Sequence, residues 1–423
     1  MSVETMTTAK SFADLYRAEK AGLPGAELPW LASLREDAAN RLLDLGLPTA
    51  RMEQWRYTPA LANRLGELAL SRAETAATAT PLLGDGAAAI TVRQGHVSLD
   101  RPGGPALRIA TLAEMLARQD AELEARLKPE SGADSAVAAI NLALLQDGLF
   151  IAAKASEAPQ VVEIAYEGDG SLANLRLDLT LESGAEVVLL ERFAGRGLTN
   201  QVARLRLAQG ARLTHVLLLE EDSDATHLAE SQVSLARDAD YRGYVFFAGT
   251  GLTRRAIDID LLEPGATAVL DGAYLLDGRG HGDLTSHIRH AAPDTTSKET
   301  VKGVLGGRSR QVFRGKITVE EGASRADGRM ANKTLLLNDQ VEIDSKPELM
   351  IFHDDVQCAH GATSGKLDEQ ALFYLRSRGL PLPLARKLLL RSFLEETLER
   401  LSDPTLSALV AARLERRLQE IAQ

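Results

Sequence analysis

The sequence predicts a mainly β protein, a parallel β-helix (solenoid) core with helical segments at both ends. From about residue 150 the chain consists of short runs rich in Val, Leu and Ile, and turns separate these runs. One of these turns recurs with a period of about 27 residues, which is within the range of solenoid repeats. No long helical pattern interrupts the repeats, so each unit is expected to contribute strands alone.

The recurring turn ends in alanine and is followed by the next strand-like run. A fixed period of this size is typical of solenoids, in which each coil stacks on the preceding one and buries an inward-facing row. A long antiparallel meander with accidental spacing is the alternative. Residues 293–296 fill the one empty slot in the series. The turn alanines are Ala185, Ala211, Ala239, Ala266 and Ala323.

Helical periodicity precedes and follows the repeats. Asp403 is the expected N-cap of the last helix, because Pro404 then occupies the first helical position. The spacing predicts helices over residues 11–21, 31–45, 112–127, 367–378 and 384–401, and a final helix that begins at 402–404.

These patterns divide the chain into three parts. We expect an N-terminal mainly helical domain at residues 1–140, a β-helix core at 141–364 and a C-terminal helical domain at 365–423. Solenoids need polar caps at their ends. The C-terminal helices are therefore expected either to cap the solenoid or to bind a partner.

Composition narrows the classes of function. The formal net charge of −11 argues against a nucleic-acid partner, which requires a basic face. No apolar run reaches the ~20 residues of a membrane span, and residues 1–10 lack a signal-peptide pattern. A single cysteine excludes an intrachain disulfide framework. A cytoplasmic protein without a membrane partner is therefore expected.

The candidate site lies in residues 351–363, which hold the only cysteine. Read as a strand, this stretch places Asp354, Val356, Cys358 and His360 on one face. A thiol and an imidazole are ligand types of zinc and of iron–sulfur clusters. A full site needs about four ligands, so a second chain or a small thiol would have to complete it. The alternative is structural, a small buried cysteine beside a hydrogen-bonded histidine.

Other candidate motifs give weaker evidence for a functional site. His287 and His290 fall on opposite faces of a strand, so we interpret them as surface or turn residues without a shared metal. Residues 361–366 resemble a phosphate loop but have too few intervening residues. The chain is therefore not expected to hydrolyse ATP.

Several short segments carry a resemblance to a known family. The most specific is the aspartate-rich run that leads into Cys-x-His-Gly-Ala-Thr at residues 354–363. The others are residues 46–49 with 55–59, 292–298 with 302–303, 313–317, 335–338, 344–348 and 373–379. Together they resemble the SufB/SufD family of iron–sulfur cluster assembly scaffolds. The resemblance covers most of the chain and is densest from about residue 285 to 395.

Within that family the chain resembles the SufD type, because a helical segment precedes the β-helix and only one cysteine is present. The resemblance implies a non-catalytic scaffold in a complex with a SufB subunit and two copies of the ATPase SufC. SufC would bind the C-terminal helices, at residues 367–401, and supply the ATP hydrolysis. SufB would pair through the ends of the two β-helices.

The resemblance also assigns the site residues. A nascent iron–sulfur cluster would form transiently at the junction with SufB, and this chain alone would hold none. His360 matches the position proposed to act there with a SufB cysteine. Cys358 matches the cysteine of the same motif, whose role is less settled. Whether the isolated chain forms a homodimer is left open.

Two alternatives remain at this point. A β-helix enzyme that acts on polysaccharide would be secreted and rich in exposed aromatics, whereas aromatics make up 4% of this chain. A self-sufficient SufB-like scaffold would be expected to carry more than one cysteine.

Overall fold

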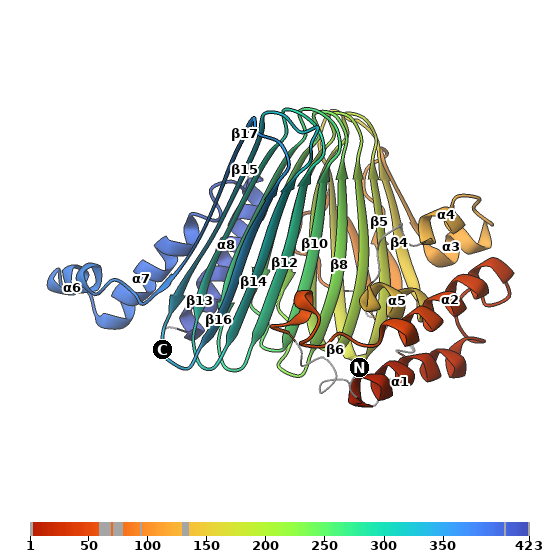
Figure 1. Ribbon diagram of the computed structural model, residues 1–423, viewed down its shortest axis with the longest axis horizontal. Coiled ribbons are helices and arrows are strands. Elements are labelled where there is room, and N and C mark those ends of the chain that lie inside the picture. The colour runs from red at the N-terminus through yellow and green to blue at the C-terminus, as the bar shows by residue number, and fades with distance from the viewer. Residues whose placement is uncertain are drawn as a thin grey trace.

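The computed structural model describes residues 3–58, 69–70, 79–93, 95–128, 135–401 and 403–421. Short parallel strands wind into a solenoid with helices at both ends, which confirms the predicted fold class (Figure 1). The strands of neighbouring coils pair in parallel, so the antiparallel meander is excluded. None of the helices in the described ranges is long and apolar enough to cross a membrane.

The N-terminal part combines helices with a few strands. Predicted helix 112–127 is two short helices instead, because Gln119 between them adopts a left-handed φ of 52° that ends the first. The elements are α1 (Val3–Glu19), α2 (Pro29–Leu45), η1 (Glu53–Trp55), β1 (Ala88–Arg93), β2 (His96–Arg101), β3 (Leu107–Thr111), α3 (Leu112–Ala117), α4 (Leu123–Leu127) and α5 (Ala136–Ala143).

The solenoid has two faces. The long strands β5 (Gln160–Leu181) and β6 (Glu186–Leu207) contribute to both, since β6 pairs with β7 through its first half and with β8 through its second. One face then continues through β7 (Arg212–Leu219), β9 (Asp240–Phe247), β11 (Thr267–Leu276), β13 (Thr296–Leu305), β15 (Ala326–Leu336) and β17 (Val356–Gly365). The other continues through β8 (Thr226–Leu235), β10 (Leu252–Leu261), β12 (His281–His290), β14 (Arg310–Val319) and β16 (Glu342–Ile351).

The turns of successive coils stack on one another, as the repeat predicted. The residue before each of the first four turn alanines is left-handed, a conformation that favours glycine or aspartate. The amide of Gly184 donates to the carbonyl of Gln209 at 2.9 Å, and the amide of Gly210 donates to that of Arg237 at 2.9 Å. The left-handed residues are Gly184 (φ 70°), Gly210 (65°), Asp238 (55°) and Gly265 (78°).

The turn near Ala323 departs from this pattern. The left-handed residue there is Arg325, with φ 58°, and its amide donates to the carbonyl of Asp355 at 2.7 Å. Asp294 fills the slot expected at residues 293–296, with φ 57°. The stack of turns therefore reaches the segment that leads directly into β17.

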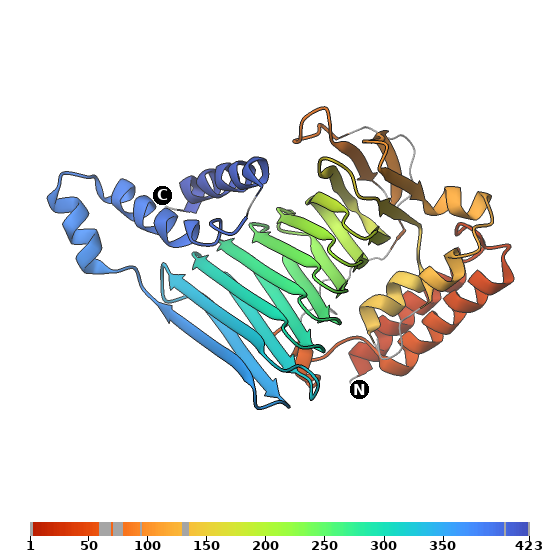
Figure 2. The same ribbon diagram turned by 90° about the horizontal axis from the view of Figure 1, so that it is seen from above.

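The interior between the two faces is apolar along most of its length, and helices cover the outer faces. Leu179, Leu205 and Val233 are among the fully buried side chains of the inward rows. Helices α2 and α5 pack on the end formed by β6, β8 and β10. The C-terminal helices α7 (Leu382–Glu395) and α8 (Pro404–Ile421) pack on the opposite side, over β9, β11 and β13 (Figure 2).

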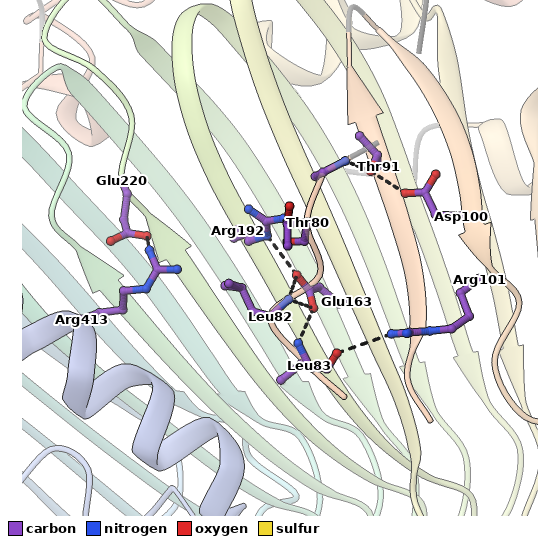
Figure 3. A network of polar contacts seen from close by, with 11 residues as sticks. Thr80, Leu82, Leu83, Thr91, Asp100, Arg101, Glu163, Arg192, Glu220 and Arg413 are labelled. Atoms are coloured by element: carbon purple, nitrogen blue, oxygen red, sulfur yellow. Dashed lines mark hydrogen bonds and ion pairs between the residues drawn. The ribbon is translucent and has the colours of Figure 1, made fainter. Parts of the chain in front are cut away.

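Ion pairs fix these outer layers. Glu163 on β5 accepts hydrogen bonds from the amides of Leu82 and Leu83 at 2.8 Å and pairs with Arg192 at 3.0 Å (Figure 3). Arg413 on α8 pairs with Glu220, also in Figure 3. The N-cap of α8 is as predicted, since Asp403 accepts from the Leu406 amide at 2.8 Å.

The remaining elements are β4 (Asp147–Ala153), which pairs with β5, and α6 (Glu369–Ser377), which extends away from the solenoid (Figure 2). The helix predicted at residues 384–401 is α7, which ends earlier than predicted, at Glu395. The division into domains at 1–140, 141–364 and 365–423 stays a prediction.

The turn stack gives the first testable prediction. Gly265→Ala would force a side chain into a left-handed turn and against the Asp238 carboxylate, so unfolding should become easier by about 1–3 kcal/mol. The measurement is chemical denaturation followed by circular dichroism.

Gly322→Ala is the matched control, because its φ is not left-handed and its surroundings are open. It should change the unfolding free energy by less than about 0.5 kcal/mol. Equal effects of the two variants would contradict a conformational origin.

Candidate functional site

The candidate site lies at the last coil, on strands with one open side. Strand β17 pairs with β15, and β16 pairs with β14. Within the described part of the chain these are the only strand pairings of β16 and β17, so neither has a hydrogen-bonded strand on its other side. The backbone groups along these edges are therefore available to another strand.

Cys358 lies on β17, half-buried against the solenoid interior. Its register partner is Gly328 on β15. The sulfur lies 3.5 Å from where a Cβ on Gly328 would sit, so the glycine leaves room for the thiol. Burial raises the pKa of Cys358, against a lowering contribution from the Gly328 backbone. The thiol rather than the thiolate is thus favoured near neutral pH.

His360 lies two residues further along the same strand and is exposed. Parallel register places Met330 of β15 beside it. Met330 itself is buried in the solenoid interior. The imidazole is therefore the ligand-type group of this strand that an incoming partner can reach most directly.

The turn before β17 is not part of the strand. Alternation of faces begins at Val356, so the predicted shared face of Asp354 with Cys358 and His360 is wrong. His353 belongs to the turn, where its Nδ1 accepts a hydrogen bond from the Asp355 amide at 3.1 Å.

The interpretation of His287 and His290 as surface or turn residues is also wrong. His290 is fully buried on β12, and its ring contacts the hydroxyls of Thr295 and Ser297, each at 2.8 Å. Burial lowers the pKa of His290 to about 4, so the ring is neutral near pH 7. His287 is partly buried and its Nε2 lies 2.9 Å from Thr318 Oγ1.

His290 lies inside the solenoid, close to Gly328, the register partner of Cys358. Its Nε2 lies 3.4 Å from the position that a Cβ on Gly328 would take, the same position that Cys358 approaches from β17. Gly328 thus separates a neutral imidazole from a half-buried thiol. A methyl group at residue 328 would touch both at ordinary van der Waals distance and would crowd only Ile317, whose Cγ2 would lie 3.2 Å away.

Glu299 is a second buried group that sequence reasoning missed. It is the β13 member of the row that continues through Met330 to His360. The Ser286 hydroxyl donates to its Oε2 at 2.9 Å, and Oε1 has no partner in the described ranges. Burial, with the nearby Asp271 charge, raises the pKa of Glu299 to about 8. A protonated carboxyl therefore lies two strands inward from His360 at neutral pH.

The ligand-type side chains at this edge do not make a complete metal site. Across the described residues, no cluster of three or more His, Cys, Asp or Glu side chains is arranged to hold a metal ion. Cys358 and His360 supply two groups, and a tetrahedral iron or zinc site takes about four.

Exposed apolar side chains lie on the same coil and on the adjoining helices. Met350, Ile351 and Phe352 at the end of β16 are each more than two-fifths exposed. On α6, Phe373 is 74% exposed and Tyr374 is 56% exposed. Isolated surface hydrophobes are common, but contiguous ones mark contact surfaces.

Comparison with protein-family models assigns the chain to a family. The SufBD core domain of the SUF system of iron–sulfur cluster assembly matches residues 164–393, which include the whole candidate site. The SufBD protein N-terminal region matches residues 6–64.

The chain belongs to the SufBD family.

Curated SufBD proteins are similar along nearly the full length. The iron–sulfur cluster assembly protein SufD of Escherichia coli is 29% identical over 395 residues, covering 89% of this chain and 91% of that protein. A SufBD family protein of Mycobacterium bovis is 27% identical, with 88% and 90% covered. One from Synechocystis is 25% identical, with 90% of each covered. The predicted family is therefore confirmed.

The raised pKa of Glu299 gives a prediction for stability. The folded chain holds this proton more tightly than the unfolded chain, where the pKa is near 4.5. The stabilisation is complete below about pH 4.5 and is lost as the pH rises toward 8. Between pH 5 and pH 9 the free energy of unfolding of the unmodified chain should therefore fall relative to that of Glu299→Gln. The expected fall is about 1.4 kcal/mol for each pH unit that separates the folded and unfolded pKa values of Glu299.

Urea unfolding at several pH values measures this difference. Glu321→Gln, in an exposed turn, is the control and should follow the unmodified chain. Parallel curves for Glu299→Gln and the unmodified chain would show that Glu299 does not hold a proton in the folded state.

Proposed function

We propose that this SufBD protein is a non-catalytic scaffold subunit that pairs with SufB through its open last coil and with the ATPase SufC through its C-terminal helices. A nascent iron–sulfur cluster, as cargo, would be built at the SufB junction with His360 as a ligand from this chain. The observation that carries the proposal is the open edge of β16 and β17, on which Cys358 and His360 lie.

The edge supports a partner of the same architecture. Unpaired strand edges favour strand addition, in which backbone hydrogen bonds provide affinity and side chains provide specificity. A second β-solenoid would continue the parallel coils and cover the apolar side chains of Met350, Ile351 and Phe352. A second copy of this chain could do the same in isolation, which is the homodimer alternative.

The chemistry favours His360 over Cys358 as the first ligand. His360 is exposed, and a neutral imidazole binds iron without losing a proton. Cys358 is half-buried with a raised pKa, so ligation by its sulfur would first require deprotonation. A partner thiolate would supply the remaining sulfur ligands, because Cys358 is the only cysteine of this chain.

The C-terminal helices support a helical or groove-bearing partner. Helix α6 buries none of its side chains and is the element farthest from the solenoid in Figure 2. Phe373 and Tyr374 are exposed there, followed by Leu384 and Leu388 on α7. Aromatic anchors of this kind are typical hot spots of protein interfaces. We assign ATP hydrolysis to the SufC partner, and place the complex in the cytoplasm.

The assembly site is tested by cluster loading. In the complex co-expressed with SufB and SufC, His360→Ala should lower the iron and sulfide content about tenfold or more, while the subunits still co-purify. Visible absorption gives an independent reading of the cluster.

His353→Ala is the matched control, because this histidine lies in the turn before β17 and bonds only to its own turn in the described structure. The complex with His353→Ala should contain as much iron and sulfide as the unmodified complex. Full loading of the His360→Ala complex would show that the site residues are structural and that the cluster chemistry lies in the partner.

The SufC contact is tested separately. Phe373→Ala with Tyr374→Ala should weaken SufC binding at least about tenfold, since each aromatic anchor is worth more than about 1.4 kcal/mol at an interface. Calorimetric titration of the full chain measures this. Leu262→Ala, at an exposed leucine in a solenoid turn, should bind SufC normally, and loss of binding in that variant would contradict the assignment.

A further inference from the structure

A concave site lies on the outer face of the solenoid formed by β8, β10, β12 and β14, and it extends to β16 of the last coil. The pocket has a volume of about 520 Å³, within the range of small-molecule sites. Its floor is formed by outward side chains of β8, β10, β12 and β14, with Glu348 of β16 at its margin. Its wall is the segment at residues 45–55, which Figure 1 shows in front of these strands.

The floor presents a guanidinium with free donors. The side chain of Arg314 on β14 is 11% exposed and lies 3.8 Å from Glu348 through Nη2 alone. Its Nε and Nη1 are buried and have no hydrogen-bond partner in the described structure. Buried donors without a partner cost free energy, and a ligand that accepts their hydrogen bonds would recover it. The Nε and Nη groups together form the fork that binds phosphate or carboxylate oxygens in a bidentate manner.

A second cation lies on the same strand. Lys316, two residues along, lies on the same face and lines the pocket, and Glu348 of β16 is its register neighbour on one side. His287 of β12 is its register neighbour and also lines the pocket. Burial and, after it, the charge of Lys316 lower the pKa of His287, so the ring is neutral and adds no third positive charge.

The wall is apolar and held in place. Trp55 is buried, and the Arg254 guanidinium stacks 4.0 Å from its ring centre. Glu53 of the same short helix pairs with Lys346 on β16, which fixes the segment across the sheet. Met52 adds a flexible apolar side chain to the wall. An apolar group of a ligand can therefore pack beside residues that are already positioned.

Acidic groups lie at the far end of the pocket. Glu230 accepts a hydrogen bond from Ser135, and Asp258 is the β10 member of the row that runs to His287 and Lys316. Burial and Asp260 raise the pKa of Asp258 to about 6, which leaves it charged at pH 7. A long polyanion would be repelled there, so the pocket suits a small molecule with its negative charge at one end.

We propose that this pocket binds a small molecule that carries a terminal phosphate group, with the phosphate on Arg314 and Lys316 and an apolar portion against Met52 and Trp55. Two adjacent cations match the double charge of a phosphate monoester better than the single charge of a carboxylate. Glu348 lies 3.8 Å from Arg314 and is the register neighbour of Lys316, so it offsets only part of the charge of the two cations.

The test is titration of the full chain with phenyl phosphate, followed by ³¹P line broadening and by calorimetry. Saturable binding in the roughly low-millimolar range or tighter is expected for a ligand of this size. Benzoate, which has the same ring and a carboxylate, should bind at least about tenfold more weakly. Binding of benzoate as tight as that of phenyl phosphate would overturn the assignment to phosphate.

Variants locate the site. Arg314→Gln and Lys316→Gln should each weaken phenyl phosphate binding about tenfold or more. Arg289→Gln is the matched control, because Arg289 lies on the same face but is held by Asp260 at 2.7 Å and does not line the pocket. Unfolding curves establish that each variant is folded.

Three further results would overturn the proposal. The unmodified chain would fail to bind phenyl phosphate, or folded Lys316→Gln would bind it as tightly as the unmodified chain does. Alternatively, Arg289→Gln would lose as much affinity as the pocket variants, which would indicate attraction by overall charge instead of a site.

Discussion

Backbone pairing between successive coils is the constraint on which the rest of this structure depends. Each coil offers a row of amide and carbonyl groups that the next coil must satisfy, so a solenoid always has two ends to close. At the first end, antiparallel strands β2 and β3 lie beside β1 and β4. At the last end, β16 and β17 have pairing partners on one side only in the described structure. This asymmetry gives the chain one end suited to a partner.

The same end concentrates the chemistry. The stacked turns carry the coil geometry as far as Asp355, and this places Val356 at the start of the last strand. Gly328 on the preceding coil makes room for Cys358, whereas His360 remains exposed beside Met330. The stack of coils thus presents two ligand-type side chains at its open end, fewer than the about four that a full metal site takes.

The C-terminal helices divide into a packed pair and an exposed helix. On one side α7 and α8 bury apolar side chains against the solenoid, and Arg400 pairs with the buried Asp271. This anchoring leaves α6 extended with its aromatic side chains exposed. Helix α6 is followed by α7, which packs on the outer face of the solenoid together with α8. The strands under these helices include β11 and β13, and β13 pairs with β15, which pairs with β17. Displacement of α6 by a partner would therefore be transmitted to the face that ends in β17.

The period of the turns predicted the solenoid because a turn that ends in a buried alanine recurs in most coils, and a left-handed residue precedes the first four of these alanines. It could not predict side-chain neighbours across coils, because the spacing drifts. Leu252 pairs with Thr226 and His281, whereas Arg310 pairs with Glu342, which lies several residues beyond one mean period. Met330 and Glu299 were therefore not recognised as neighbours of His360.

Inward polar groups were equally hidden from the sequence. Apolar alternation predicts an apolar interior, yet Glu191 is fully buried and accepts hydrogen bonds from Tyr166 at 2.8 Å and from Gln201. Its Oε1 lies 2.8 Å from His215 Nε2. Burial opposes its ionisation, but His215 and Arg255 lower its pKa to about 2. Only the three-dimensional pairing of distant coils assembles such a cluster. The resemblance at residues 354–363 identified the site itself, since residue types alone left a structural interpretation open.

The central claim is that the last coil is an edge for a partner β-solenoid. Hydrogen–deuterium exchange of the full chain, alone and with SufB, tests it most directly. The amides of β16 and β17 that face away from β14 and β15 should exchange rapidly in the isolated chain and become protected with SufB. Those of β9, which is paired on both sides, should not change. Exchange at β16 and β17 that is unaffected by SufB, in a complex that still forms, would contradict the account.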